Sequence, residues 1–183
     1  MRTLTFTAAL ACGSMLALNA PAGARNPMVG GAAMYPTRTI VENAVNSKDH
    51  TTLVAAVKAA GLVDTLSGKG PFTVFAPTNA AFAKLPAGTV ENLVKPEKKA
   101  TLTSILTYHV VPGRYTAGQI ASMAAMHHGT ATLTTVQGEK LRFTKNGSTW
   151  LVVDAKGGKA RITIPNVMQS NGIIHVVDTV LMP

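Results

Sequence analysis

The sequence predicts an α+β domain, because the spacing of its apolar residues changes once along the chain. In the first half of the 183 residues, apolar side chains recur at intervals of three and four, the period of a helix packed by one face. From Thr130 onward they recur at intervals of two, the period of a strand with one buried face. Helices that precede a run of strands in this way are typical of an α+β domain.

Residues 1–24 have the features of a secretory signal peptide. Arg2 supplies a positive charge, an apolar stretch follows, and a small-residue Ala-Gly-Ala motif ends the segment. The apolar stretch is too short to span a membrane. We therefore expect an exported chain in which residues 25–33, rich in Gly and Ala, form a flexible lead-in to one domain over residues 34–183.

The cysteine count and the net charge limit which chemistry and which partners we expect. Cys12 is the only cysteine and lies in the expected signal peptide, so the mature chain has no disulfide, thiolate nucleophile or thiolate metal ligand. The formal net charge of +9 favours acidic partners such as anionic glycans or envelope phosphates. Nucleic acid is the least expected of them, because no nucleic-acid-binding module is visible.

Short helices are expected throughout the first half. Asp49 stands where an N-cap would start one helix, and Gly61 stands where a C-terminal glycine would stop it. Pro96 occupies a favoured first-turn position of a later helix, which the Pro-Gly pair at 112–113 ends. Apolar spacing and these boundary residues place helices in the segments 37–46, 49–60, 62–66, 79–85, 90–94, 96–109 and 116–123.

The segment 70–82 is expected to fold as a strand, a tight corner and a helix. Its apolar, β-favouring run is bounded by prolines and is typical of one buried strand. The second proline cannot continue a strand ladder, and residue 78 or 79 can cap the helix that follows. The residues that we expect to shape the strand, the corner and the helix are Phe72, Thr73, Phe75, Pro77, Asn79 and Phe82.

The strands of the second half are separated by glycine-containing turns. Candidate strands are the segments 133–136, 140–144, 149–153, 160–164 and 173–177. Before the last of them, Asn171 and Gly172 supply turn chemistry. That strand, which contains His175, is apolar on both alternating faces, as expected of a central strand.

The segments 70–82 and 171–183, with Tyr108-His109 followed by Val-Val-Pro-Gly between them, resemble the fasciclin-like domain family. The resemblance covers about residues 34–183. It implies a compact β-sandwich or wedge with helices packed on it, and a role in adhesion or surface binding. For the Tyr-His pair it implies a packing role, and in some animal members the pair is part of a proposed integrin-contact surface.

The histidines divide into two kinds. His109 lies on an apolar helical face and His175 in a strand buried on both faces, so we expect both to be hydrogen-bonded core residues. His127 and His128 lie in a loop flanked by Met and Gly, where adjacent histidines can bind copper or zinc weakly. A fixed metal site needs three or four ligands, so we expect no metal and no cofactor and keep this loop as an alternative.

The sequence gives little support for an enzyme. There is no Gly-x-Ser-x-Gly nucleophile elbow, and the few carboxylates are scattered along the chain. A pair of carboxylates of the glycosidase kind could still form across the fold, so an exported hydrolase stays as a third hypothesis.

A cluster of cations is the most suggestive local feature. Alternation along two strands places Lys140, Arg142 and Arg161 on one outward face, with the lysines of the neighbouring turns beside them. We expect this face to contact acidic polysaccharide or a lipid head-group layer, while an ordinary solvated face stays open as the alternative. The whole cluster is Lys140, Arg142, Lys145, Lys156, Lys159 and Arg161.

These observations predict a secreted, periplasmic or cell-surface domain without enzyme activity. It would act in adhesion or matrix association, through contacts with an extracellular or cell-surface protein or an acidic polysaccharide. The alternative is an envelope protein that binds a small ligand or a metal through His127 and His128.

Overall fold

The computed structural model describes residues 26–183, and its helices are short. The expected signal peptide and Cys12 lie outside the described residues. None of the helices described is long and apolar enough to cross a membrane. The α-helices and 3₁₀-helices (η) are α1 (Ile40–Asn46), η1 (Lys48–His50), α2 (Thr51–Ala60), α3 (Val63–Ser67), α4 (Asn79–Ala83), α5 (Thr89–Leu93), η2 (Pro96–Lys98), α6 (Lys99–Tyr108) and α7 (Ala117–Met126).

The strands of the described residues form a small hairpin and one seven-stranded sheet. The sheet has the strand order β4-β3-β9-β8-β7-β6-β5, in which β3 and β9 are parallel and the other neighbours are antiparallel. The strands are β1 (Met28–Val29), β2 (Ala32–Ala33), β3 (Phe72–Pro77), β4 (Val110–Pro112), β5 (Thr130–Thr134), β6 (Lys140–Asn146), β7 (Thr149–Val153), β8 (Lys159–Gln169) and β9 (Gly172–Val177).

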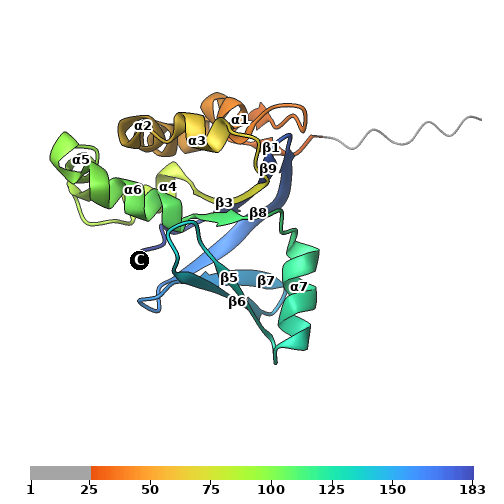
Figure 1. Cartoon of the computed structure of the whole chain (residues 1–183). Coiled ribbons are helices and arrows are strands. Elements are labelled where there is room, and N and C mark those ends of the chain that lie inside the picture. The colour runs from red at the N-terminus through yellow and green to blue at the C-terminus, as the bar shows by residue number, and fades with distance from the viewer. Residues whose placement is uncertain (1–25) are drawn as a thin grey trace, which may run out of the picture.

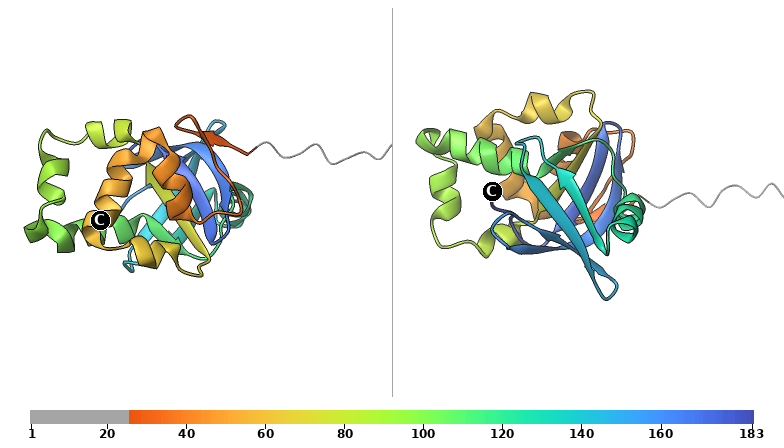
Figure 2. Two further views of the ribbon diagram at one scale, coloured as in Figure 1. Left: turned by 90° about the horizontal axis from the view of Figure 1, so that it is seen from above. Right: turned by 60° about the horizontal axis from the view of Figure 1, so that its bottom comes forward.

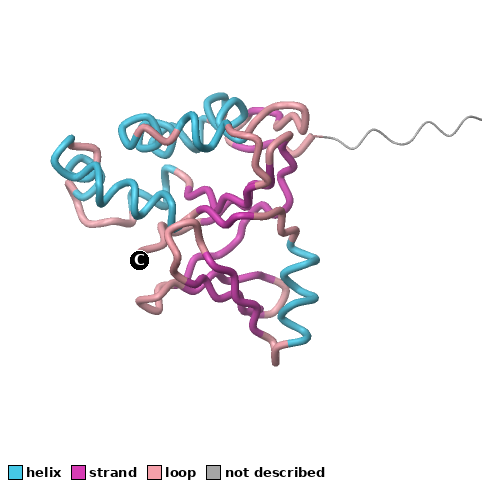
Figure 3. The backbone as a smooth tube through the Cα atoms, in the orientation of Figure 1, coloured by secondary structure: helices cyan, strands magenta, loops and turns pink. Residues whose placement is uncertain are grey.

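The sheet curls until its two edges almost meet. The Val136 amide, just beyond β5, donates a hydrogen bond to the Val110 carbonyl in β4 at 2.8 Å. Figure 1 shows α1 to α3 above β3 and β9, with β5 to β7 curling away below and α7 at one end. The turned views in Figure 2 show the same wedge, and Figure 3 shows that the helices lie outside the curl. This is the α+β arrangement that the change of period predicts.

The N-terminal segment corrects one expectation from the sequence. Residues 28–33, predicted as part of a flexible lead-in, form the hairpin of β1 and β2, and Val29 is only 3% exposed. Gly30 and Gly31 have φ of +58° and +76°, so these glycines serve a turn. A Cβ on Gly30 would lie 2.5 Å from the Asp49 amide, which shows how closely the turn packs on the helical layer.

Helix capping differs from the prediction at the start of α2. Asp49 lies inside η1, and α2 has no side-chain cap of its own at its N-terminus. The amide of Thr52 in that helix donates instead to the side-chain oxygen of Asn79, at 3.0 Å. The cap of α4 is Thr78, one of the two residues expected there, and its hydroxyl accepts from the Ala81 amide at 3.3 Å.

Two apolar cores lie on opposite sides of β3 and β9. The first, between the sheet and α1 to α6, contains Val74, Phe82, Leu106 and Ile174, and we call it the helix-side core. The second fills the curl of the sheet under α7. The first strand of the sequence motif feeds both cores, because successive side chains of a strand point to opposite faces.

The aromatic rings meet in the second core. The Phe75 ring centroid lies 5.2 Å from that of Phe143 and 5.5 Å from that of His175, on which it stacks. Phe72, at the start of the same strand, is only half-buried.

Candidate functional site

The cations that the sequence groups together are all exposed and lie on or beside β6, β7 and β8. The strand register decides which of them share a face. Arg142 is paired with Val153, and Val153 is paired with Lys159, so the two cations lie on one face of the sheet. Lys140 and Arg161 are each two residues away along their strands and join them. We call these four residues the basic sheet face.

Two of the six cations do not lie where the sequence predicts them. Lys159 was expected in a turn, but it is the first residue of β8 and belongs to the basic sheet face. Lys145 is paired with Trp150, which packs against the second core, so it lies on the opposite face at the end of its strand. Lys156 lies in the turn between β7 and β8.

The cations of the basic sheet face are free to meet a partner. Within residues 26–183 the one ion pair joins Lys84 and Asp178, at 3.6 Å, and none of the four cations takes part in an ion pair. The exposed hydroxyl residues Thr132 and Thr134 of β5 are paired with Arg142 and Lys140, so polar donors continue across the face. A shallow hollow lies between Thr132, Lys140 and Arg142.

The Tyr108-His109 pair is buried, and both side chains make hydrogen bonds to the backbone. The Tyr108 hydroxyl accepts from the Ala155 amide at 2.8 Å. The His109 ring bonds the Ile105 carbonyl through Nδ1 at 2.8 Å, and its Nε2 accepts from the Leu181 amide at 3.0 Å. Burial lowers the pKa of His109 to about 4, so the ring is neutral at pH 7. This pair joins the end of α6 to the turn between β7 and β8 and to the C-terminal segment.

His175 has the same character. Its Nε2 lies 2.8 Å from the Tyr115 carbonyl, and its Nδ1 accepts from the Asn166 amide at 3.4 Å. Burial lowers the pKa of His175, so this ring is also neutral at pH 7. Both hydrogen-bonding nitrogens are held by backbone groups, which leaves no atom of the ring to act on a substrate.

The other motif residues hold the sheet to its neighbours. Thr73 is buried, and its hydroxyl donates to the Gly113 carbonyl at 2.7 Å and accepts from the Tyr115 amide at 2.9 Å. The side chain of Asn171 accepts from the Ile40 amide at 3.0 Å and donates to the Leu66 carbonyl at 2.7 Å.

Gly172 lies in a closely packed position, and Pro77 lies at the end of a strand. A Cβ on Gly172 would lie 2.0 Å from the carbonyl oxygen of Phe72, so this position excludes any side chain. Pro77 is the last residue of β3, and the next amide, that of Thr78, still donates to the Val177 carbonyl of β9 at 3.3 Å. Phe82 of that helix is buried in the helix-side core.

The histidine loop lies at the far end of the molecule, after α7. His127 and His128 are exposed, and His128 has a φ of +51°. No group of three or more His, Cys, Asp or Glu side chains that could hold a metal occurs in the part of the chain that the structure describes. The loop itself offers two imidazoles from this chain.

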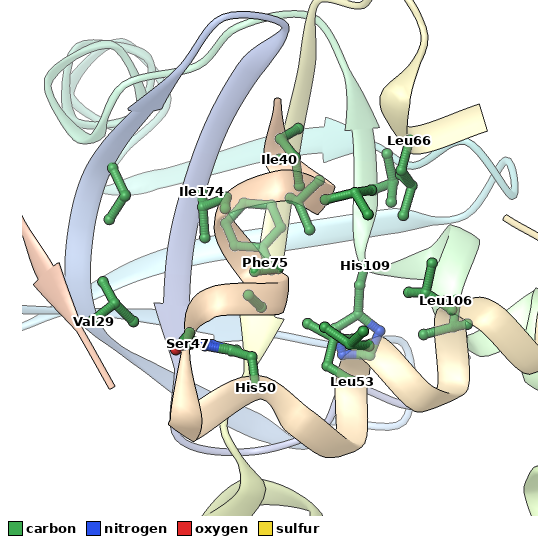
Figure 4. Close-up of a pocket in the computed structure, with 18 of the residues that line it drawn as sticks. Val29, Ile40, Ser47, His50, Leu53, Leu66, Phe75, Leu106, His109 and Ile174 are labelled. Carbon is green, nitrogen blue, oxygen red and sulfur yellow. Dashed lines mark hydrogen bonds between the residues drawn. The ribbon is translucent and has the colours of Figure 1, made fainter. Parts of the chain in front are cut away.

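One buried histidine escaped the sequence analysis altogether. His50 is 3% exposed, its Nδ1 lies 2.9 Å from the Ser47 hydroxyl, and the ring lines an apolar pocket beneath α1 and α2 (Figure 4). The only signal in the sequence was its place in the first turn of the amphipathic helix expected over residues 49–60. That place does not distinguish a buried histidine from a solvated one.

Comparison with known proteins agrees with this architecture. Protein sll1483 of Synechocystis sp. is 49% identical over 160 residues, which cover 87% of this chain and 81% of that protein. Cell surface glycolipoprotein MPB83 of Mycobacterium bovis is 37% identical over 169 residues, which cover 87% of this chain and 68% of that one.

A solved structure shows the same fold. The FAS1 domain pair of the insect cell adhesion molecule fasciclin I matches with a TM-score of 0.70 at 21% identity, over 80% of this chain and 51% of that chain. In sequence, the fasciclin domain family model matches residues 48–183, most of the chain. The resemblance inferred from the motifs is thus confirmed, and this chain belongs to the fasciclin domain family.

Proposed function

We propose that this protein is an exported adhesion or surface-association domain that binds an acidic polysaccharide through the basic sheet face. The observation that carries the proposal is the presence of four exposed cations on one face of neighbouring strands, none of them in an ion pair within the described residues. The strands that carry these cations pack on a buried core by their other face, so the core holds the backbone positions of the four residues.

The chemistry of the face favours a polyanion over a single small anion. One exposed ion pair contributes only about 0–1 kcal/mol, so binding through such contacts needs several of them at once. A chain of acidic sugars provides repeated charges, and its hydroxyls can bond the threonines of β5. Because these contacts stay in solvent, their strength should fall as the salt concentration rises.

The names of two similar proteins also support the proposal. One is a cell surface glycolipoprotein and another is a cell adhesion molecule, which supports a place outside the cytosol and a role in adhesion. The absence of enzyme activity is part of the proposal. It is supported by the three buried histidines, whose rings are packed in the core and bonded mainly to backbone or hydroxyl groups.

The test is binding of the purified protein to immobilised acidic and neutral polysaccharides at two salt concentrations. We expect binding to acidic chains that weakens at high salt. It should be lost in the triple variant Lys140→Gln, Arg142→Gln, Arg161→Gln. A matched control removes the same charge from the helical side, as Lys95→Gln, Lys98→Gln, Lys99→Gln. Equal loss in the two variants would show that net charge alone matters and would refute a role for this particular face.

A further inference from the structure

The loop after α7 presents two neighbouring imidazoles to solvent. The chain has five histidines, of which His50, His109 and His175 are buried and His127 and His128 are exposed. The Cα atoms of consecutive residues lie only about 3.8 Å apart, so two adjacent imidazoles can reach one metal ion. The ring nitrogens of neutral imidazole are the commonest metal ligands in proteins.

Two methionines precede this loop at helical spacing. Met126 is the last residue of α7, and Met123 lies one turn earlier. Residues three and four positions apart are neighbours on a helix surface, so Met123 lies beside both Met126 and His127. The Met126 side chain is 70% exposed, whereas Met123 packs partly against the second core. The loop therefore combines two imidazoles with an exposed thioether sulfur, which is a soft ligand.

Hydrogen bonds close the loop into a tight turn. The amides of His127 and Gly129 both donate to the Ala124 carbonyl, at 3.1 and 2.8 Å. The Thr130 amide donates to the His127 carbonyl at 3.1 Å. His128 has a φ of +51°, the left-handed conformation that glycine usually supplies after the last turn of a helix. A side chain there costs free energy relative to glycine, and residues in such conformations cluster at functional sites. This conformation therefore indicates a use for the imidazole of His128.

The surroundings of the loop favour a cation with a single positive charge. The carbonyl end of α7 carries a partial negative charge, and its last turn has no basic side chain to balance it. A carboxylate beside the two imidazoles would complete a group of three such ligands, and no group of that kind occurs in residues 26–183. Lys145 follows Thr144, the strand partner of Thr130, and its positive charge repels a divalent ion more strongly than a monovalent one.

We propose that this loop binds one Cu(I) ion through the ring nitrogens of His127 and His128 and the thioether of Met126. Cu(I) is monovalent and soft, and thioether and imidazole are among the ligands that copper prefers. With Met126 included, the loop supplies three ligands, whereas a structural zinc site takes four, so Cu(I) fits better than Zn(II).

Oxidised copper fits the loop less well. Cu(II) prefers a square plane of nitrogen and oxygen ligands. Backbone amides that could complete such a plane are used in the turn, since those of His127, Gly129 and Thr130 donate to carbonyls. The site is also separate from the basic sheet face. The loop precedes Thr130, the first residue of β5, whereas Lys140 pairs with Thr134, the last one.

Cu(I) binding to the full-length protein can be measured without oxygen, in competition with the coloured chelator bicinchoninate. The protein should carry Cys12→Ser, because a cysteine thiol binds Cu(I) by itself. We expect one tightly held ion per chain and weaker binding of Zn(II). Ag(I), which is also soft and monovalent, should shift the ring nitrogens of His127 and His128 in NMR spectra and leave those of His175 unchanged. Zn(II) that binds as tightly as Cu(I), or Ag(I) that shifts neither exposed ring, overturns the proposal.

Variants test the ligands separately from the fold. His128→Gly removes an imidazole and suits the left-handed backbone, so it should raise Tm. It should also weaken Cu(I) binding at least about tenfold, the loss expected when only an outer partner of a metal ligand is removed. Met126→Leu should weaken Cu(I) binding and leave Tm unchanged, whereas Met28→Leu, at another exposed methionine, should change neither. A His128→Gly protein that binds Cu(I) as tightly as its parent rules the site out.

Discussion

The Nε2 atom of His109 accepts a hydrogen bond from the amide of Leu181, 72 positions further along the chain. The same ring bonds the Ile105 carbonyl through Nδ1, so one imidazole fastens the end of α6 to the C-terminal segment. Both partners are backbone groups that no water can reach at this depth, since His109 and Leu181 are almost completely buried.

Replacing His109 by Phe should lower the free energy of unfolding by about 1–3 kcal/mol, because it leaves the Leu181 amide buried without a partner. Urea unfolding followed by circular dichroism measures the change. The control is His127→Phe, the same substitution at an exposed position. A loss of equal size in the control would refute the structural role of the His109 ring.

Stability should fall as the pH drops from about 6.5 toward 4. The folded-state pKa of His109 is about 4, below the ordinary value of 6.5, so between these two values the unfolded chain binds more protons than the folded one. This histidine contributes up to about 3 kcal/mol, present above pH 6.5 and lost as the pH falls through the window. Burial lowers the pKa of His50 and His175 in the same direction. Urea midpoints that stay constant between pH 7 and pH 4.5 would contradict this expectation.

Asn79→Ala should destabilise the protein by about 1–2 kcal/mol, the usual cost of a lost helix cap. The side chain bonds the Thr52 amide at 3.0 Å and the Lys48 carbonyl at 2.8 Å, so its loss affects the start of α2 and not the helix in which it lies. Hydrogen exchange should increase at the first amides of α2. Asn92→Ala, an exposed asparagine of α5, should leave that exchange unchanged.

Two glycine substitutions should have opposite effects. Gly172→Ala places a methyl group 2.0 Å from the Phe72 carbonyl in the neighbouring strand, so we expect a loss of about 3 kcal/mol or failure to fold. Gly118 lies in α7, and a Cβ added there would lie 3.8 Å from its nearest neighbour, the hydroxyl oxygen of Thr116. Gly118→Ala should therefore stabilise the protein by about 0.5–1 kcal/mol. Thermal unfolding measures both, and a well-folded Gly172→Ala protein of native stability would show that the strands can separate at this point.

The strand register makes a prediction about the basic sheet face that the sequence alone could not make. Lys159→Gln should weaken binding to acidic polysaccharide about as much as Arg161→Gln, because both side chains lie on that face. Lys145→Gln should have little effect, because it lies on the opposite face. Equal effects of all three single substitutions, measured at one salt concentration, would contradict the assigned faces.

The sequence was sufficient for the fold class and for the family. Period and boundary residues are local signals, and the motif around Phe72 and Pro77 is local as well. Lys159 shows what such signals miss. Its strand begins there because Asp154 accepts a hydrogen bond from the Gly158 amide at 2.6 Å and closes the turn early. The alternation of apolar and polar residues does not predict the residue at which a turn ends.

The pocket and the Asn79 contact were missed for a related reason. His50 and Asn79 act on groups of other elements, such as the wall beneath α1 and the start of α2. Contacts of this kind depend on how elements pack in space. A single sequence gives no measure of that packing.

The place of β9 has a consequence for how the protein is made. This strand lies in the middle of the sheet, between β3 and β8, and yet it is the last of the strands in residues 26–183. Its parallel partner β3 is about one hundred residues earlier, so the two cores can close only after the residues between these strands have been synthesised. Pairings over such distances form slowly, because the intervening chain must first be brought together. The closure of the sheet therefore depends on a contact between two segments far apart in the sequence, and not on neighbouring hairpins alone.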